Sequence, residues 1–413
     1  MNRQSIFPIS VNSQQIISQR LDTIESTLVM THCMNDSMIG SKKRVLFIDQ
    51  IKAIMIALVI AIHVPFAFGD GGWIGARVVV DGPVPVFRFS IGLFGYLCQS
   101  TFMYMLFLLS GYFVPRSVHK KGIRSYLKSR ALRLGLPFLA GLLLINNGAV
   151  LVGTQSPNSP FADLPWGALP FNRIGVLWFL IVLFVFDLLY CGWAAFRGDR
   201  YSIDASVPLP QLRSWLMSAF VLGVLEVLMA TRIDLWSSLA RSPLDGLGAQ
   251  GMHIFTYAFL FFLGCKASFH KWIERLDSHL VVKWSRFSVA LFIALATTSL
   301  GLFVHGSLAT EYAKLMLVGS FCYPFVAWGF ISYLLLWFQR NPNYFGQWLA
   351  TAGVDSYGAY VIHTLVLSLV ISAISSAGLN HWLVFLAVAS LTILISFVAS
   401  HQLRRIPALA RVI

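Results

Sequence analysis

The sequence predicts an all-α, polytopic transmembrane helical bundle of about ten spans, and three observations lead to this prediction. Apolar stretches close to 20 residues long recur along the chain, and an α-helix needs this length to cross the hydrocarbon core of a bilayer. Only 12% of the 413 residues are charged and 57% are hydrophobic, whereas a soluble domain carries about 25% charged residues. Lysine and arginine are concentrated in alternate connections, as the positive-inside rule requires.

Each predicted span is an apolar run bounded by charged, polar or turn-forming residues. In chain order the spans are 45–68, 90–114, 134–153, 174–196, 212–231, 252–269, 286–304, 315–338, 354–375 and 382–402. Prolines end or interrupt several of them, at Pro65, Pro115, Pro137 and Pro324. These prolines do not fall at corresponding places in two halves of the chain, and no internal repeat is evident. The pattern that favours a secondary transporter is therefore missing.

The distribution of basic residues predicts the topology. Of the 31 lysines and arginines, 24 lie in the two terminal tails and in the connections on the same side, six lie on the opposite side, and Lys52 lies inside the first span. With an even number of spans, this asymmetry places both termini in the cytoplasm. The formal net charge of +14 is spread over these connections and does not form one patch, which argues against nucleic acid as a partner.

Three parts of the chain are expected. Residues 1–43 are rich in Ser, Gln and Asn and have no apolar core or cleavage-site pattern, so we expect a disordered cytoplasmic tail and no signal peptide. Residues 44–405 form the transmembrane domain, and 406–413 form a short cytoplasmic C-terminal tail. The five cysteines lack CxxC or metal-ligand spacing, so no disulfide framework and no metal site is predicted.

The first span carries the strongest candidates for chemistry, Asp49, Lys52 and His63. Eleven residues separate Lys52 from His63, which is about three helical turns plus 20°, so both project from nearly the same face about 16 Å apart. Asp49 lies three residues before Lys52, close enough to pair with it. Ionisable groups inside a membrane helix normally face a wet or protein-lined interior. Snorkelling to the surface is an alternative for Lys52 and Asp49, but His63 is too deep for it.

Two further motifs lie at the cytoplasmic ends of the second and third spans. In Ser110-Gly111-Tyr112 the glycine permits close backbone approach, and the flanking hydroxyls suit either substrate contact or helix packing. Arg130 and Arg133, at i and i+3 before Pro137, share a helix face and suit a phosphate ligand. Ordinary positive-inside charge or anionic lipid contact would explain the arginines equally well.

Three other ionisable residues lie inside spans and need partners, namely Asp187, Glu226 and His363. Asp187 and Glu226 are compatible with buried structural pairs. A lone membrane histidine is more often a packing or hydrogen-bonding group than a catalyst, so His363 stays outside the predicted site.

The motifs, in this order, resemble the acyltransferase 3 family of bacterial membrane acyltransferases. The matching segments are FIDQIKAIMIALVIAIH, LLSGYFVP, SRALRLGLP, GVLWFLIVLF and SYGAYVIH, and the resemblance covers about residues 44–405. Within the family the chain looks most similar to the branch that includes relatives of glucan biosynthesis protein C. Two features depart from the family pattern: Lys52 stands where an arginine is usual, and Leu183 stands where another branch has an acid.

The resemblance implies an O-acyltransferase of the inner (cytoplasmic) membrane that moves an acyl group of the acetyl or succinyl class. The donor would be cytoplasmic acyl-CoA, with its phosphates on Arg130 and Arg133 and its pantetheine arm passing Ser110 and Tyr112. His63 would act as general base on a hydroxyl of a glycan or lipid-linked glycan, with Lys52, held by Asp49, supplying positive charge. Direct transfer is preferred over an acyl-histidine intermediate.

The main alternative from another class is a proton- or ion-coupled transporter or flippase that uses Lys52, Asp187, Glu226 and His363 as a relay. A non-catalytic scaffold of an envelope-polymer assembly is a third reading. Consumption of a thioester that depends on His63 separates the enzyme from both. Membrane lipids are expected partners in every case, and the sequence is compatible with a homo-oligomer.

Overall fold

The computed structural model describes residues 46–70, 72–79, 84–157, 159–197, 202–374 and 380–412. The chain divides into two units, Met1–Phe47 and Ile48–Ile413, and every contact discussed below lies within the second. The predicted tail 1–43 falls outside the described residues. The part of 406–413 that is described contains one short helix, α16 (Pro407–Ala410).

The fold class is confirmed, because ten helices of the described chain are long and apolar enough to cross a membrane and no named strand occurs among these residues. The ten are Leu46–Phe68, Pro85–Lys121, Ile123–Thr154, Gly175–Arg197, Leu212–Ala230 (α8), Gly251–His270, Ser278–Val304 (α12), Leu308–Arg340 (α13), Gly346–Ile374 (α14) and His381–Leu403 (α15). Each coincides with one predicted span. Two short helices, α9 (Ile233–Ala240) and α10 (Asp245–Gln250), lie in the connection between the fifth and sixth.

The second span is longer than predicted and is broken into α2 (Pro85–Gln99) and α3 (Phe102–Lys121). The break lies at Ser100 and Thr101, whose side-chain hydroxyls both donate to the carbonyl oxygen of Leu97, at 2.9 and 2.8 Å. Such side-chain bonds compete with the helical ladder and bend it. A straight helix over Pro85–Lys121 would be about 55 Å long, well beyond the hydrocarbon thickness, so the break lets the segment turn.

The basic stretch 116–133, between the predicted second and third spans, is helical except at Gly122. Helix α3 continues through Lys121, Gly122 makes the turn with φ of 75°, and α4 begins at Ile123. Lysine and arginine allow this because their long side chains reach the membrane surface from a helix that emerges from it. The seven lysines and arginines of this stretch therefore lie on the last part of α3 and the first part of the third span.

The third span begins with α4 (Ile123–Arg130) and contains two π-helical stretches, Ala131–Gly135 and Gly141–Asn146, which flank Pro137. Proline has no N–H, so the carbonyl oxygen of Arg133, four residues earlier, loses its helical donor. That oxygen instead accepts a hydrogen bond of 2.6 Å from the hydroxyl of Tyr357 on α14. Single π-helical turns of this kind are frequent at functional sites.

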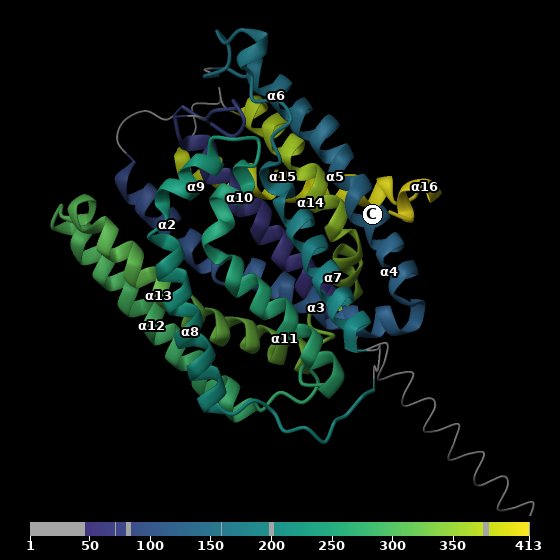
Figure 1. Ribbon diagram of the computed structural model, residues 1–413. Helices are drawn as coiled ribbons and strands as arrows, with labels where there is room; N and C mark the ends of the chain where they lie inside the picture. The colour runs from purple at the N-terminus through teal and green to yellow at the C-terminus, as the bar shows by residue number, and fades with distance from the viewer. Residues whose placement is uncertain are drawn as a thin grey trace, which may run out of the picture. The chain divides into compact units, whose positions relative to one another are not determined.

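Close packing centres on α3 and α14. Helix α3 lies along α11 (Ile254–His270), α14 pairs with α15, and α12 pairs with α13, the two green helices side by side in Figure 1. At Gly111 a Cβ atom would overlap the carbonyl oxygen of Phe261, and at Gly264 one would overlap that of Leu108. These two glycines let α3 and α11 touch backbone to backbone. Gly353 of α14 meets the backbone of Asp49 in the same way.

Candidate active site

One cavity of about 560 Å³ brings together five of the seven predicted site residues. Asp49, Lys52, Ser110, Arg130 and Arg133 all line it. Its volume lies within the range of small-molecule and cofactor pockets. Its walls come from the first helix, α3, α4, the start of α7 (Trp178–Arg197), α14, and the segment after α15.

The cavity lies on the side of the bundle that we call the basic side, where the even-numbered spans end and the odd-numbered ones begin. Four further cations lie around Lys52 in its lining, namely Lys121, Arg130, Arg133 and Arg404. Asp49 is the carboxylate among the lining residues. Near the end of the chain, Ala410 and Val412 also line the cavity. A cavity with this balance of charge suits an anionic ligand.

Lys52 and Asp49 are paired, as their spacing predicts. The Lys52 ammonium lies 3.0 Å from Oδ1 of Asp49, and the lysine side chain keeps 35% of its surface exposed. Its Nζ atom also lies 5.5 Å from the centre of the Phe113 ring. The lysine therefore points into the cavity and is held between a carboxylate and an aromatic face.

Arg130 contacts Asp187, a carboxylate whose partner was not predicted from the sequence. Nε of Arg130 lies 2.8 Å from Oδ2 of Asp187 and donates to the hydroxyl of Tyr126 at 3.0 Å. Tyr126 in turn donates to Oδ1 of Asp187 at 2.7 Å. The aspartate side chain is fully buried, while the arginine keeps 23% exposure. Both partners approach Nε, Arg130 lines the cavity, and no bond to its terminal nitrogens is found among the described residues.

Arg133 differs from Arg130 in having an exposed side chain. Its backbone is fixed by the bond from Tyr357 to its carbonyl oxygen, and its side chain lines the cavity. No salt bridge to its guanidinium is found among the described residues. Of the two arginines, Arg133 is therefore the one whose guanidinium has no ion-pair partner among the described residues.

The three residues of the Ser110-Gly111-Tyr112 motif take different roles. Ser110 lines the cavity, and Gly111 is the close-packing contact with α11. Tyr112 does not line the cavity; its hydroxyl donates to Oε1 of Glu274 at 2.6 Å. The motif thus combines the two readings that the sequence left open, with a helix-packing residue next to a cavity residue.

His63 lies outside the cavity, towards the opposite side of the bundle, where it contacts His363. The centres of the two imidazole rings are 5.2 Å apart, and the indole of Trp73 lies 4.9 Å from His63. Nδ1 of His63 bonds the carbonyl oxygen of Val59, and Nδ1 of His363 bonds that of Tyr360. A carbonyl oxygen only accepts, so both Nδ1 atoms carry a proton, and Nε2 is the atom of each ring that remains to accept one.

The contact of His363 with His63 was not predicted from the sequence. The Nε2 atom of His363 is buried and has no hydrogen-bond partner among the described residues, which leaves an acceptor free beside His63. The spacing of residues along α14 is a signal for this contact. Tyr360 follows Gly353 after seven residues and His363 follows Tyr360 after three, so all three lie on one face of the helix. Gly353 contacts the first helix beside Asp49, and the same face reaches His63 ten residues later.

Tyr360 separates the two halves of the site. It lines the inner end of the cavity, its ring centre lies 5.9 Å from that of His363, and its hydroxyl donates to the carbonyl oxygen of Val176. The cavity and the histidine pair are therefore one side chain apart.

Glu226 takes part in a separate buried network. It accepts hydrogen bonds from Tyr104 and Thr256 and lies 2.6 Å from Nδ1 of His253. None of these groups lines the cavity. Among the described residues, no group of three His, Cys, Asp or Glu side chains is placed to hold a metal ion.

A family model described as an acyltransferase domain matches residues 45–401. No curated protein and no solved structure gives a significant match. The matched region contains all ten membrane helices apart from the last two residues of the tenth, together with the His63–His363 pair and the donor cavity except for its lining residues Arg404, Ala410 and Val412. The chain therefore belongs to the acyltransferase 3 family and is a multi-pass membrane acyltransferase.

Proposed function

We propose that this enzyme moves an acyl group of the acetyl or succinyl class from cytoplasmic acyl-CoA to a hydroxyl of a glycan or lipid-linked glycan, at a bacterial inner membrane. The observation that carries the proposal is the basic cavity of about 560 Å³ that gathers Lys52, Ser110, Arg130 and Arg133, one side chain away from the His63–His363 pair. The charge asymmetry of the sequence supports a cytoplasmic opening for that cavity.

In the donor complex, the phosphates of acyl-CoA lie on Arg133 and on the terminal nitrogens of Arg130. Arginine suits this role because its planar fork grips phosphate oxygens in pairs. The pantetheine arm passes Ser110 and brings the thioester towards Tyr360. Lys52 contributes positive charge along this path and is held in place by Asp49. Tyr112 has no part in donor binding, because its hydroxyl is committed to Glu274.

The transfer step is a direct attack. The acceptor hydroxyl donates its proton to Nε2 of His63 while its oxygen bonds to the thioester carbonyl carbon. The carbon–sulfur bond then breaks, and the proton passes from His63 to the CoA thiolate, so the imidazole returns to its starting form. Nδ1 of His63 is fixed on the carbonyl of Val59, which aims Nε2 at the acceptor. His363 is a positioning residue whose ring packs against that of His63.

Variants of His63 test the proposal directly. The His63→Ala protein should insert, fold and bind acyl-CoA, because the donor cavity does not include this side chain. Release of free CoA thiol should fall by roughly 10²–10⁴, the usual contribution of a positioned acid–base group. His305→Ala, at an exposed histidine after α12, is the matched control and should keep full activity.

Lys52 variants separate charge from structure. Lys52→Arg should retain far more activity than Lys52→Ala, because arginine keeps the charge beside Asp49.

A folded His63→Ala enzyme as active as the parent would contradict the assignment of the base. In that case Lys52 and the cavity would still hold the donor, and the base would have to be sought among the remaining groups near Tyr360.

A further inference from the structure

A second cavity, of about 860 Å³, lies on the other side of α3 from the donor cavity. Helices α8, α11 and α13 line it, together with the start of α12 and the segments 207–211 and 272–277. Leu108 of α3 faces this cavity, whereas Leu109 and Ser110 face the donor cavity. The two spaces are therefore distinct, and the segments that close the second one lie on the basic side.

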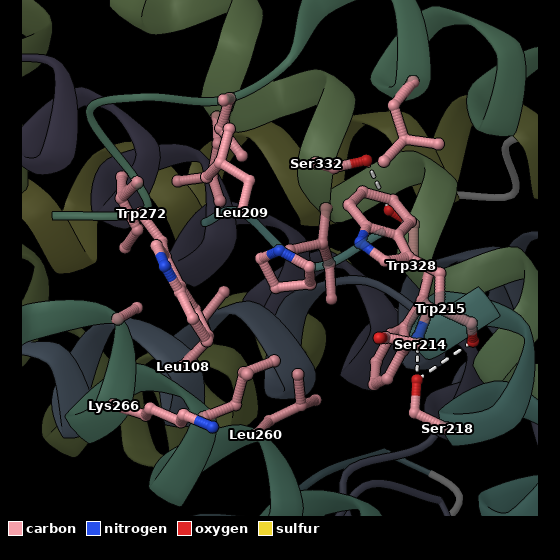
Figure 2. Close-up of a pocket in the computed structure, with 18 of the residues that line it drawn as sticks. Leu108, Leu209, Ser214, Trp215, Ser218, Leu260, Lys266, Trp272, Trp328 and Ser332 are labelled. Carbon is pink, nitrogen blue, oxygen red and sulfur yellow. Dashed lines mark hydrogen bonds between the residues drawn. The ribbon is translucent and has the colours of Figure 1, made fainter. Parts of the chain in front are cut away.

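The walls of this second cavity are almost wholly apolar. Trp215 and Trp328 form one side of it, as Figure 2 shows, and leucine and phenylalanine side chains fill much of the rest. Three polar side chains on that side are already bonded: Nε1 of Trp328 donates to Ser218 at 2.9 Å, and Ser332 donates to the carbonyl oxygen of Trp328 at 2.5 Å. A cavity lined in this way favours hydrocarbon over water.

An exposed lysine and a buried indole N–H that lacks an acceptor lie together on the opposite side of the cavity. Lys266 and Trp272 are neighbours there (Figure 2), with Nζ of Lys266 5.4 Å from the centre of the indole ring. The Trp272 side chain is 8% exposed, and its Nε1–H is buried without an acceptor among the described residues. A buried donor without an acceptor costs about 1–3 kcal/mol. Both groups would be satisfied by an anionic oxygen ligand.

The one carboxylate of the lining does not compete for that position. Asp277 caps the start of α12, where its Oδ1 accepts from the backbone N–H groups of His279 and Leu280 at 2.9 and 3.4 Å. Lys266 has no carboxylate within ion-pair distance among the described residues. The positive charge at this end of the cavity is therefore available to a ligand.

We propose that this cavity binds an anionic glycerophospholipid from the leaflet on the basic side. The phosphate lies between Lys266 and the indole N–H of Trp272, and an acyl chain fills the apolar space between Leu108 and Trp328. The position of the cavity supports a lipid occupant, because α8 and α12 bury the smallest share of their side chains of the ten spans and so face the bilayer. A soluble anion would match the cation but not the apolar walls.

Brominated lipids test the proposal, because bromine on an acyl chain quenches the fluorescence of nearby indoles. The purified full-length protein is titrated in nanodiscs with phosphatidylglycerol or phosphatidylcholine brominated at the same chain positions. We expect quenching by phosphatidylglycerol at about fivefold lower mole fraction, the advantage of one cation near an anionic headgroup. Lys266→Ala should abolish this preference. Lys283→Ala, at an exposed lysine of α12 outside the cavity, is the matched control and should keep it.

A variant that fills the cavity separates its contribution from that of bulk lipid around the protein. Ser214 lines the cavity in an exposed position, so Ser214→Phe can place a ring in the space and should reduce quenching by both lipids, with thermal unfolding confirming the fold. Equal quenching by the two lipids in the parent, or an unchanged preference in Lys266→Ala, would overturn the proposal. So would displacement of the brominated phosphatidylglycerol by a polyprenyl phosphate but not by unbrominated phosphatidylglycerol.

Discussion

Substitution of the two cavity arginines gives the sharpest test of donor binding, because the structure predicts different outcomes for neighbours three residues apart. Arg133 is exposed and has no salt bridge among the described residues, so Arg133→Ala should leave stability within about 0.5 kcal/mol of the parent. Its loss removes a charged hydrogen bond to phosphate, worth about 1.5–3 kcal/mol. The KM for acyl-CoA should therefore rise roughly 10- to 150-fold with little change in kcat.

Arg130→Ala should behave differently, because it leaves Asp187 buried without a cation. Asp187 has no exposed surface, while Arg130 is 23% exposed. The expected loss of stability is about 3 kcal/mol, the lower end for a broken buried pair. Arg130→Ala combined with Asp187→Asn removes the stranded charge and keeps the bond from Tyr126, so it should recover part of that stability. The weaker donor affinity should remain.

Three measurements separate these effects: thermal unfolding in detergent, equilibrium binding of CoA, and release of free thiol at varied acyl-CoA. The combination that refutes the reasoning is a folded Arg133→Ala enzyme whose KM and CoA affinity stay within twofold of the parent. The arginine pair would then serve only topology and folding, and the phosphates would have to bind elsewhere on the basic side.

Two further predictions concern the fold. Gly111→Ala places a Cβ atom against the carbonyl oxygen of Phe261, and since both partners belong to helix backbone we expect a loss of about 3 kcal/mol, the upper end of overpacking costs; a melting temperature equal to that of the parent would show that the helices can separate freely. A reporter fused at position 160 should report the outside and one fused at 275 the cytoplasm, and the reverse pattern would remove the basis for a cytoplasmic donor.

The helices themselves were predictable because burial in a bilayer leaves few choices. An apolar run of about 20 residues must satisfy its backbone internally, so each run that the sequence shows becomes one helix of the structure. Hydrogen bonds between side chains and the neighbouring backbone could not be predicted from the sequence. The break at Ser100 and Thr101 depends on which hydroxyls turn back to Leu97, and no hydropathy pattern reports that choice.

The site was predictable to the extent that it lies on one helix or one short motif. Asp49 and Lys52 pair because a helix places i and i+3 together. The contact of His363 with His63 was not predicted because it depends on the packing of α14 against the first helix, three hundred residues away in sequence. Asp187 likewise pairs with Arg130 through a tertiary contact between two spans. The residues next to Asp187 in the sequence do not indicate this partner.

The position of Ala410 and Val412 in the wall of the donor cavity has a practical consequence for handling the protein. A purification tag or fluorescent protein joined after Ile413 would be separated by one residue from Val412, which lines that wall. Kinetic constants from C-terminally tagged protein would thus report the tag as well as the enzyme.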